Sequence, residues 1–319
     1  MFIKKFDCVI AVDFFIVGER KYALALLTKR RVCCIMYTNK KGGASMYPDT
    51  IFLGMDLYSI CIAVGVLAVL ILADKMGIKR GFSIGLQKLV IISIVAGVTI
   101  GFLGGILFQA VYHWIDTGTF TLNAGMTFYG GLIFGAGTVL FCWFVLSKPF
   151  KVYEEAVAKF KHLADMAACL IPLAHGFGRL GCLFAGCCYG NKTSSWLGIE
   201  MHGVKRMPIQ LFEAIFLFLL SAALFWLFFK QMKTENKGKY FPLLPVYLIA
   251  YGVWRFVIEY ARGDERGATI VSFLSPSQLI AVILFAVGIG YFIVWHVQKA
   301  NKKEKEEKKD ENNGSDEGV

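Results

Sequence analysis

Long apolar runs divide most of this chain and point to a lipid bilayer as its surroundings. A transmembrane helix needs about 20 predominantly apolar residues, and several runs approach that length in a chain that is 56% apolar and 18% charged. We therefore expect an all-α integral membrane protein with seven transmembrane helices. The expected spans are roughly residues 54–73, 88–111, 129–147, 166–189, 208–230, 241–261 and 276–296.

Charges in the loops indicate how these spans are oriented. Clusters of Lys and Arg follow the first, third and fifth spans, whereas the loop 112–128 has neither residue. In the loop 262–275 two Arg are balanced by two acidic residues, and the loop 190–207 is a mild exception. Because short basic loops stay in the cytoplasm, we expect the N-terminus outside and the C-terminus in the cytoplasm. The net charge of +11 is thus assigned to topology and anionic lipid, not to nucleic acid.

The chain divides into three parts. Residues 1–45 are basic, and their apolar run is too short to span. We interpret them as an extension that either precedes a native start at Met46 or is a dispensable arm. Residues 46–297 form the seven-helix domain. We expect residues 298–319 to form a charged cytoplasmic tail whose first part can extend the last helix and whose end is disordered.

The most unusual stretch runs from His175 to Gly190, next to an apolar lead-in. It contains one His, one Arg, three Cys and five Gly at or near membrane depth. An Arg inside a bilayer costs at least a few kcal/mol, so Arg179 is a functional candidate by default. His175 lies four residues earlier and therefore on the same helix face.

Two further spans carry polar stripes at helical spacing. In the fifth span Gln210 and Glu213 lie one turn apart, shortly after Arg206. The stripe of the sixth span consists of Tyr251, Arg255, Glu259 and Arg262. Because charges avoid lipid, we expect the stripes to converge inside the bundle.

The converging stripes contain more arginines than carboxylates. Four Arg face only Glu213 and Glu259, and the natural anion in a bilayer is a lipid phosphate, which Arg binds bidentately. The alternative is that Arg255 and Glu259 form a neutral structural pair while Arg262 reaches toward the interface.

The three cysteines of the glycine-rich stretch follow the spacing C-x4-C-C. The usual metal-ligand pair is C-x2-C, and no second pair lies nearby in the sequence. We expect Cys182, Cys187 and Cys188 to pack as small residues in a Gly-rich helix and expect no metal. Zinc binding is the alternative.

Six motifs in a fixed order resemble those of the prolipoprotein diacylglyceryl transferases, a family of bacterial integral membrane enzymes. The resemblance extends from about Met46 to Val297. The motifs are Leu57-Tyr-Ser, Tyr129-Gly-Gly-Leu-Ile, Gly178-Arg-Leu-Gly, Arg206-x-Pro-x-Gln-Leu-Phe-Glu213, Tyr251-Gly-x-x-Arg-x-x-x-Glu-x-x-Arg262 and Ser275-Pro-Ser-Gln278.

The resemblance implies a reaction, its partners and its place. The diacylglyceryl group of phosphatidylglycerol would pass to the lipobox cysteine thiol of a prolipoprotein signal peptide, and glycerol phosphate would leave. No cofactor is implied, and the enzyme would be a multi-pass protein of the bacterial inner membrane. Arg179 and Arg255 match the catalytic arginines. The matching substrate-binding positions are Arg179, Gly130, Gly131, Arg206, Gln210, Glu213, Tyr251, Glu259 and Arg262.

Two departures from the family pattern affect the chemistry. Tyr129 stands where the family usually has the His that is its proposed base, and a Tyr ionises only well above neutral pH. We expect His175 to supply the base, because His titrates near neutral pH; a purely structural His175 is the alternative. Cys182 and Cys187 replace the family's usual Asn and Glu.

These departures leave two other functions open. The first is a related lipid-headgroup transferase with another acceptor. The second is a non-catalytic phospholipid transporter, although no inverted repeat is visible in the sequence.

Overall fold

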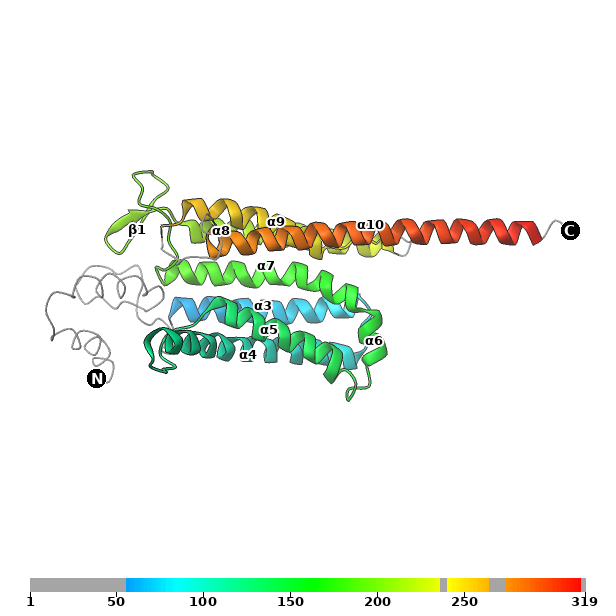
Figure 1. The fold of residues 1–319 in the computed structure, drawn as a ribbon, viewed down its shortest axis with the longest axis horizontal. Coiled ribbons are helices and arrows are strands. Elements are labelled where there is room, and N and C mark those ends of the chain that lie inside the picture. The colour runs from blue at the N-terminus through cyan, green and yellow to red at the C-terminus, as the bar shows by residue number, and fades with distance from the viewer. Residues whose placement is uncertain (1–55, 236–239, 264–273, 317–319) are drawn as a thin grey trace. The chain divides into compact units, whose positions relative to one another are not determined.

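The computed structural model describes residues 56–235, 240–263 and 274–316, so the basic extension 1–45 lies outside the described residues. Helices dominate this part of the chain (Figure 1). The α-helices are α3 (Leu57–Lys79), α4 (Ile84–Thr117), α5 (Phe128–Phe141), α6 (Tyr153–Ala158), α7 (Phe160–Phe184), α8 (Ile209–Glu235), α9 (Leu244–Ile258) and α10 (Pro276–Asp316).

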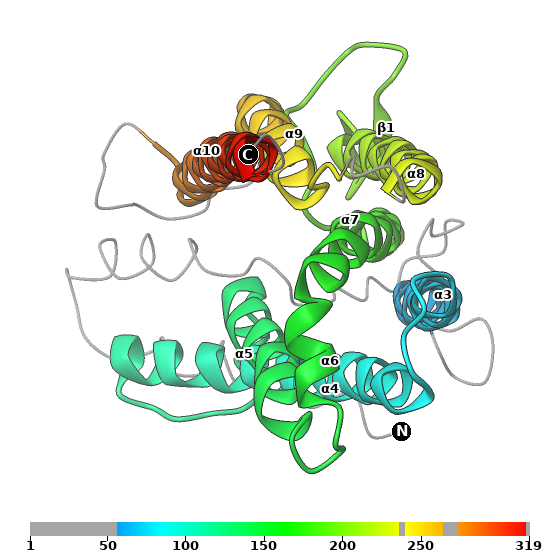
Figure 2. The same cartoon turned by 90° about the vertical axis from the view of Figure 1, so that its right-hand side faces the viewer.

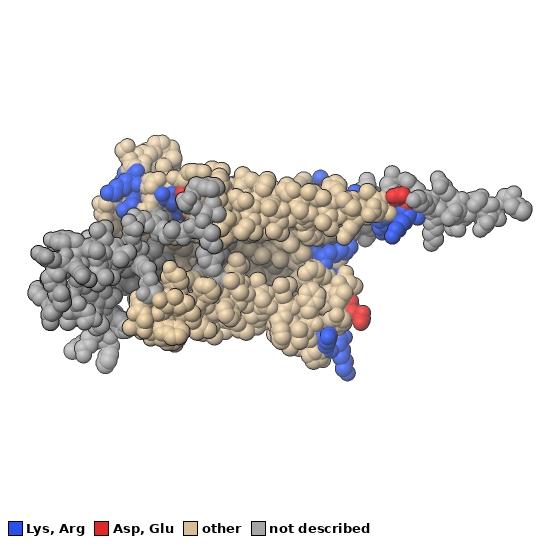
Figure 3. All heavy atoms as spheres, viewed as in Figure 1, with Lys and Arg blue, Asp and Glu red and all other residues tan. Residues whose placement is uncertain are grey.

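Five of the described helices are long and apolar enough to cross a bilayer: α3, α4, α7, α8 and α10. Figure 3 shows that the Lys, Arg, Asp and Glu visible on one face gather toward the two ends of the helices and leave the middle uncharged. These observations support the predicted helical membrane protein. The other two predicted spans are shorter. Span 129–147 corresponds to α5 with a π-helical turn at Cys142–Leu146, and span 241–261 to α9 with a 3-10 turn at Glu259–Ala261.

Polar side chains determine where several helices begin. The Asp56 carboxylate accepts from the Ser59 N–H at 2.8 Å and begins α3. The Ser83 hydroxyl accepts from Leu86 N–H at 3.2 Å at the start of α4. Such caps satisfy donors that the first helical turn cannot pair internally.

Helix pairs build the bundle. In the end-on view of Figure 2, α4 lies beside α5, α9 lies beside α10, and α7 lies between α3 and α8, in agreement with the contacts between these elements. The α4–α5 pair is close because glycines face one another: a Cβ added at Gly101 would lie 2.9 Å from the Gly131 carbonyl oxygen. Close backbone approach through small residues is the usual way for membrane helices to pack.

The predicted fourth span extends too far along the chain. Helix α7 ends at Phe184, five residues before the expected end at residue 189. Gly186, with a left-handed φ of 63°, follows shortly after the helix end, as is common where helices stop. Cys187 and Cys188 therefore lie beyond the helix, and the expectation that they pack within it is wrong.

A short β-hairpin occupies the loop between α7 and α8, which the all-α prediction missed. Strand β1 (Ile199–Met201) pairs antiparallel with β2 (Val204–Arg206). His202 and Gly203 between them have φ values of 54° and 72°, the left-handed pair that a tight two-residue hairpin turn requires.

Backbone hydrogen bonds join the segment after α7 to its neighbours. Gly190 N–H donates to Met207 O at 2.9 Å, just before α8, and Asn191 N–H donates to Ala261 O at 3.0 Å, just after α9. A Cβ at Gly190 would lie 2.7 Å from Met207 O, so only glycine fits there. The C-terminal end of α7 is thus held beside the start of α8 and the end of α9.

Helix α10 is longer than its apolar part. It continues to Asp316, into the tail 298–319, whose first part was expected to be able to extend the last helix. The tail is rich in Lys and Glu, which are good helix formers and form favourable pairs one turn apart.

Helix α7 contains a buried carboxylate that was not predicted. Asp165 is fully buried, accepts from Leu243 N–H at 2.8 Å and from Gln231 Nε2 at 3.1 Å, and lies 4.0 Å from Arg80 Nη2. Burial and the nearby Asp165 carboxylate raise the pKa of the Tyr240 phenol above its usual range. This cluster connects α7 to α8, to the start of α9 and to Arg80, the residue that follows α3.

Candidate active site

Glu213 lies at the centre of the polar side chains that were expected to converge. Its side chain is 1% exposed, and Oε2 lies 2.9 Å from Arg179 Nε. The Tyr251 hydroxyl donates to Oε1 at 3.3 Å, and His175 Nε2 lies 3.9 Å from the same oxygen. These residues come from α7, α8 and α9, so the predicted convergence of the three stripes is confirmed.

Aromatic rings surround this carboxylate on the α9 side. The rings of His175 and Tyr251 meet edge to face with centroids 5.3 Å apart, and Tyr247 stacks on Tyr251 at 5.9 Å. Tyr247 and Tyr251 are buried. The rings exclude water from Glu213, and charged interactions are stronger in such surroundings than in solvent.

Glu259 organises a second cluster at the end of α9. Its Oε2 lies 2.7 Å from Arg255 Nη2 and 3.8 Å from Arg262 Nε. The Ser275 hydroxyl donates to Glu259 Oε1 at 2.8 Å, and Arg255 Nη2 also donates to the Ser277 hydroxyl at 2.7 Å. The start of α10 therefore orients the charged groups of α9.

Ser275 and Gln278 also fix the start of α10 itself. Gln278 N–H donates to the Ser275 hydroxyl at 3.2 Å, and Ser275 N–H donates to Gln278 Oε1 at 3.0 Å. This reciprocal pair is a capping box, with Pro276 in the first helical position. The motif Ser275-Pro-Ser-Gln278 carries this signal, although no role was predicted for these residues.

The two clusters form one electrostatic unit. Arg255 and Arg262 are close enough to Glu213 to interact with it across the space between helices. Arg255 Nη1 is buried and has no hydrogen-bond partner among the described residues. A buried guanidinium donor without an acceptor is costly, so an anionic oxygen of a ligand would be favoured there.

Arg206 and Gln210 contact the segment that follows α7. The Arg206 guanidinium carbon lies 4.0 Å from the centroid of the Tyr189 ring, and Gln210 Nε2 donates to Cys187 O at 2.6 Å. The first contact joins two residues of the loop between α7 and α8, and the second holds this loop against α8. Whether either side chain also binds substrate stays a prediction.

The Tyr129-Gly-Gly motif lies in the first turn of α5. The position of the Tyr129 side chain is outside what the structure describes. A Cβ at Gly130 would lie 2.8 Å from Gly104 O, so the lack of a side chain there is explained by packing against α4. The substrate-binding role expected for Gly130 and Gly131 stays a prediction.

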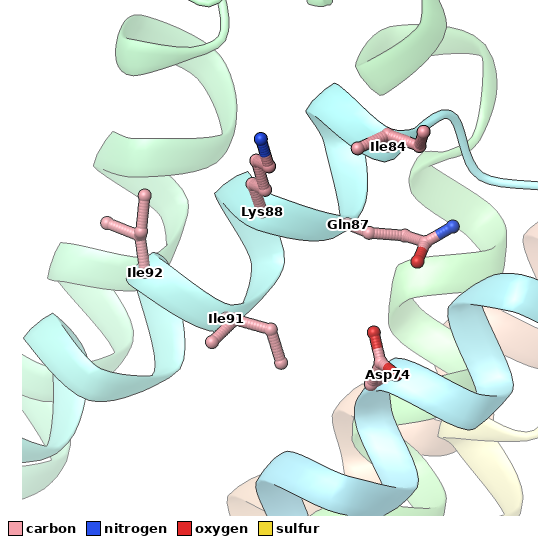
Figure 4. Close-up of a pocket in the computed structure, with 6 residues that line it drawn as sticks. All are labelled: Asp74, Ile84, Gln87, Lys88, Ile91 and Ile92. Carbon is pink, nitrogen blue, oxygen red and sulfur yellow. The ribbon is translucent and has the colours of Figure 1, made fainter.

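A surface hollow of about 390 Å³ lies elsewhere, between α3 and α4. Figure 4 shows Asp74 and Gln87 reaching into the space between the two helices, with Ile91 to their left. None of the predicted site residues lines this hollow.

The fold and these clusters together define a multi-pass membrane protein in which guanidinium groups from neighbouring helices gather around two buried carboxylates. Residues 49–294 match the family model for prolipoprotein diacylglyceryl transferase. A protein named phosphatidylglycerol–prolipoprotein diacylglyceryl transferase from Clostridium tetani is 34% identical over 259 residues, which cover 76% of this chain and 94% of that protein. The chain belongs to the prolipoprotein diacylglyceryl transferase family.

Other similar proteins carry the same name. A Clostridium perfringens protein with the same name and the number 2 is 33% identical over 272 residues, covering 80% of this chain and 96% of its own. A Dehalococcoides mccartyi protein is 32% identical over 250 residues, which cover 74% of this chain and 87% of that protein.

Proposed function

We infer that this chain is a transferase that moves the diacylglyceryl group of phosphatidylglycerol to a cysteine thiol of a prolipoprotein. The observation that carries this proposal is the pair of arginines, a partly buried Arg179 and a buried Arg255, of which Arg255 has a donor without a partner among the described residues. The names of the similar proteins specify the same donor and acceptor.

The arginines suit the leaving group of this reaction. The acceptor sulfur forms a thioether bond to a glycerol carbon, the bond between that carbon and a phosphate oxygen breaks, and glycerol phosphate leaves with the electron pair. Arg179 and Arg255 would bind the phosphate bidentately and stabilise the charge that develops on its oxygen. Glu213 and Glu259 would orient the two guanidinium groups through the contacts described above.

The acceptor thiol must lose a proton to become nucleophilic. We assign the base to His175, which lies 3.9 Å from Glu213 and one turn before Arg179. Glu213 would stabilise the imidazolium after proton transfer, as a carboxylate does beside other catalytic histidines. Tyr129 is the competing assignment, because it occupies the position of the family's usual histidine.

The proposal also assigns the chain a membrane, a topology and a depth for its site. We assign the chain to the bacterial inner membrane with seven spans, in which α5 and α9 are the two short ones, the N-terminus is outside and the C-terminus is cytoplasmic. The site would then lie near the outer face. Glu213 lies near the start of α8, whereas Arg179 lies near the end of α7 and Arg255 near the end of α9. The acceptor cysteine would be that of a lipobox. Arg206, Gln210, Tyr251 and Arg262 would help to hold the substrates.

Incubation of purified protein with phosphatidylglycerol and a lipobox peptide tests the proposal. Diacylglyceryl-peptide and released glycerol phosphate support it. Transfer to another nucleophile, but not to the peptide thiol, would identify a related lipid-headgroup transferase; the Cys182 and Cys187 substitutions motivate this second candidate. Lipid movement between leaflets without any bond formation would indicate a transporter.

A further inference from the structure

Three thiols meet where α7 ends. The sulfur atoms of Cys182, Cys187 and Cys188 all lie within 4.8 Å of one another, and the three residues are half-buried. Cys182 belongs to the last turn of α7, and Cys187 N–H donates to Cys182 O at 3.1 Å. The chain therefore folds back over its own helix end, and this turn, rather than helical spacing, brings the sulfurs together.

The backbone that brings the third sulfur into the group is unfavourable. Cys188 has a φ of 61°, a left-handed conformation that is uncommon for a residue with a side chain. Strain of this kind persists only where surrounding contacts impose it, and it is concentrated at functional sites. The hydrogen bond from Gln210 to Cys187 O, at 2.6 Å, is one such contact.

The spacing of the sulfurs fits a metal ion. Zinc–thiolate bonds of about 2.3 Å in a tetrahedral site place sulfur atoms about 3.8 Å apart. Small side-chain rotations would therefore bring the three sulfur atoms to the separation that a bound metal ion requires.

We propose that Cys182, Cys187 and Cys188 form a three-thiolate site for one thiophilic metal ion of the class that includes Zn²⁺, Cd²⁺ and Cu⁺. Zinc sites with three protein ligands usually keep a fourth position open for an external ligand, whereas structural sites are closed by four. Among the described residues, the cluster contains these three ligands and no fourth His, Cys, Asp or Glu.

The open position suits a thiol, and this step rests on the proposed function because the acceptor there is a cysteine. The acceptor sulfur would bond to the metal as its S–H bond breaks, and the proton would pass to solvent without any change in oxidation state. A metal-bound thiol is deprotonated outright. This would lessen the need for a strong base in a chain that has Tyr129 at the family's usual histidine position.

Titration of the reduced, metal-free full chain in detergent with Cd²⁺ tests the site without any activity assay. Thiolate-to-cadmium charge-transfer absorption should saturate at one ion per chain. Cys182→Ser, Cys187→Ser and Cys188→Ser should each weaken binding by more than about 100-fold, because even residues outside the ligand shell change metal affinity by about 10–100-fold. Two control variants should bind like the parent chain. They are Cys142→Ser, which removes a buried thiol elsewhere, and the triple variant Cys8→Ser/Cys33→Ser/Cys34→Ser.

Two results would overturn the site: no saturable absorption, or loss of the signal in the variant altered at positions 8, 33 and 34. Adding a lipobox peptide to the cadmium complex should change the absorption, whereas its Ser analogue should not. An unchanged spectrum would refute thiol binding. Transferase activity measured on metal-free protein distinguishes the transferase function from activation of the acceptor thiol by the metal. Full activity would refute thiol activation and leave the transferase assignment intact.

Discussion

Glu213 Oε2 lies 2.9 Å from Arg179 Nε, and this contact joins α8 to α7 at the centre of the polar cluster. This ion pair restrains one edge of the guanidinium. A planar guanidinium held at one edge still presents its remaining N–H groups in a defined direction. A lysine ammonium at the same position would keep the charge but lose this geometry.

We therefore expect Arg179→Lys to lower kcat for diacylglyceryl transfer by about 100-fold or more, the usual loss when an oxyanion donor is removed. The measurement is the initial rate with phosphatidylglycerol and a lipobox peptide. Lys205→Ala, which removes an exposed charge from β2, is the control and should keep the parental rate. An Arg179→Lys variant with parental kcat would exclude a bidentate role for Arg179.

The choice of base is tested by a pair of variants. His175→Ala should lower kcat by about 100-fold or more, because general base catalysis contributes at least that factor in most enzymes. Tyr129→Phe should keep the parental rate. If the results are reversed, the base is Tyr129. If both variants keep full activity, no side chain of this pair removes the proton.

Ser277 is expected to position Arg255 without contacting substrate. Hydrogen bonds to charged groups contribute about 1.5–3 kcal/mol, so Ser277→Ala should lower kcat/KM by about 10-fold or more. The loss should be reduced in Ser277→Thr, which keeps a hydroxyl. Ser221→Ala, which removes a buried hydroxyl bonded to Cys169 O, should leave kcat/KM unchanged; an equal loss in both variants would indicate a general packing effect.

The close contact of α4 and α5 predicts a stability difference between two glycines. A Cβ at Gly101 would lie 2.9 Å from Gly131 O, whereas a Cβ at Gly137 meets nothing within 4 Å among the described residues. Gly101→Ala should lower the free energy of unfolding by about 1–3 kcal/mol, as overpacking does. Gly137→Ala should not destabilise the protein. Thermal unfolding of both variants in detergent is the measurement, and equal unfolding temperatures would contradict the packing.

Much of the site was predictable because charges within apolar spans are costly and helical spacing assigns them to faces. Arg179, Glu213 and Tyr251 were expected to converge on that basis, and they do. The contact between Arg255 and Glu259 also follows from a spacing of four residues. The spacing of Ser275 and Gln278 is typical of a capping box, but the start of α10 was not predicted from it.

Other features depend on details that periodicity does not carry. The end of α7 at Phe184 lies within an apolar run, so the placement of Cys187 and Cys188 beyond it could not be inferred. The hairpin β1–β2 is too short to give an alternating pattern. The partners of Asp165 lie 66 and 78 residues further along the chain, and only tertiary packing brings them together.

Product stoichiometry tests the proposed reaction most directly. Purified protein in vesicles of phosphatidylglycerol receives a lipobox peptide, and thioether-linked diacylglyceryl-peptide and free glycerol phosphate are quantified together by mass spectrometry. We expect equal amounts of the two products, and neither product above background with Arg179→Ala. Glycerol phosphate released without thioether would identify a lipid hydrolase and would contradict the transferase assignment.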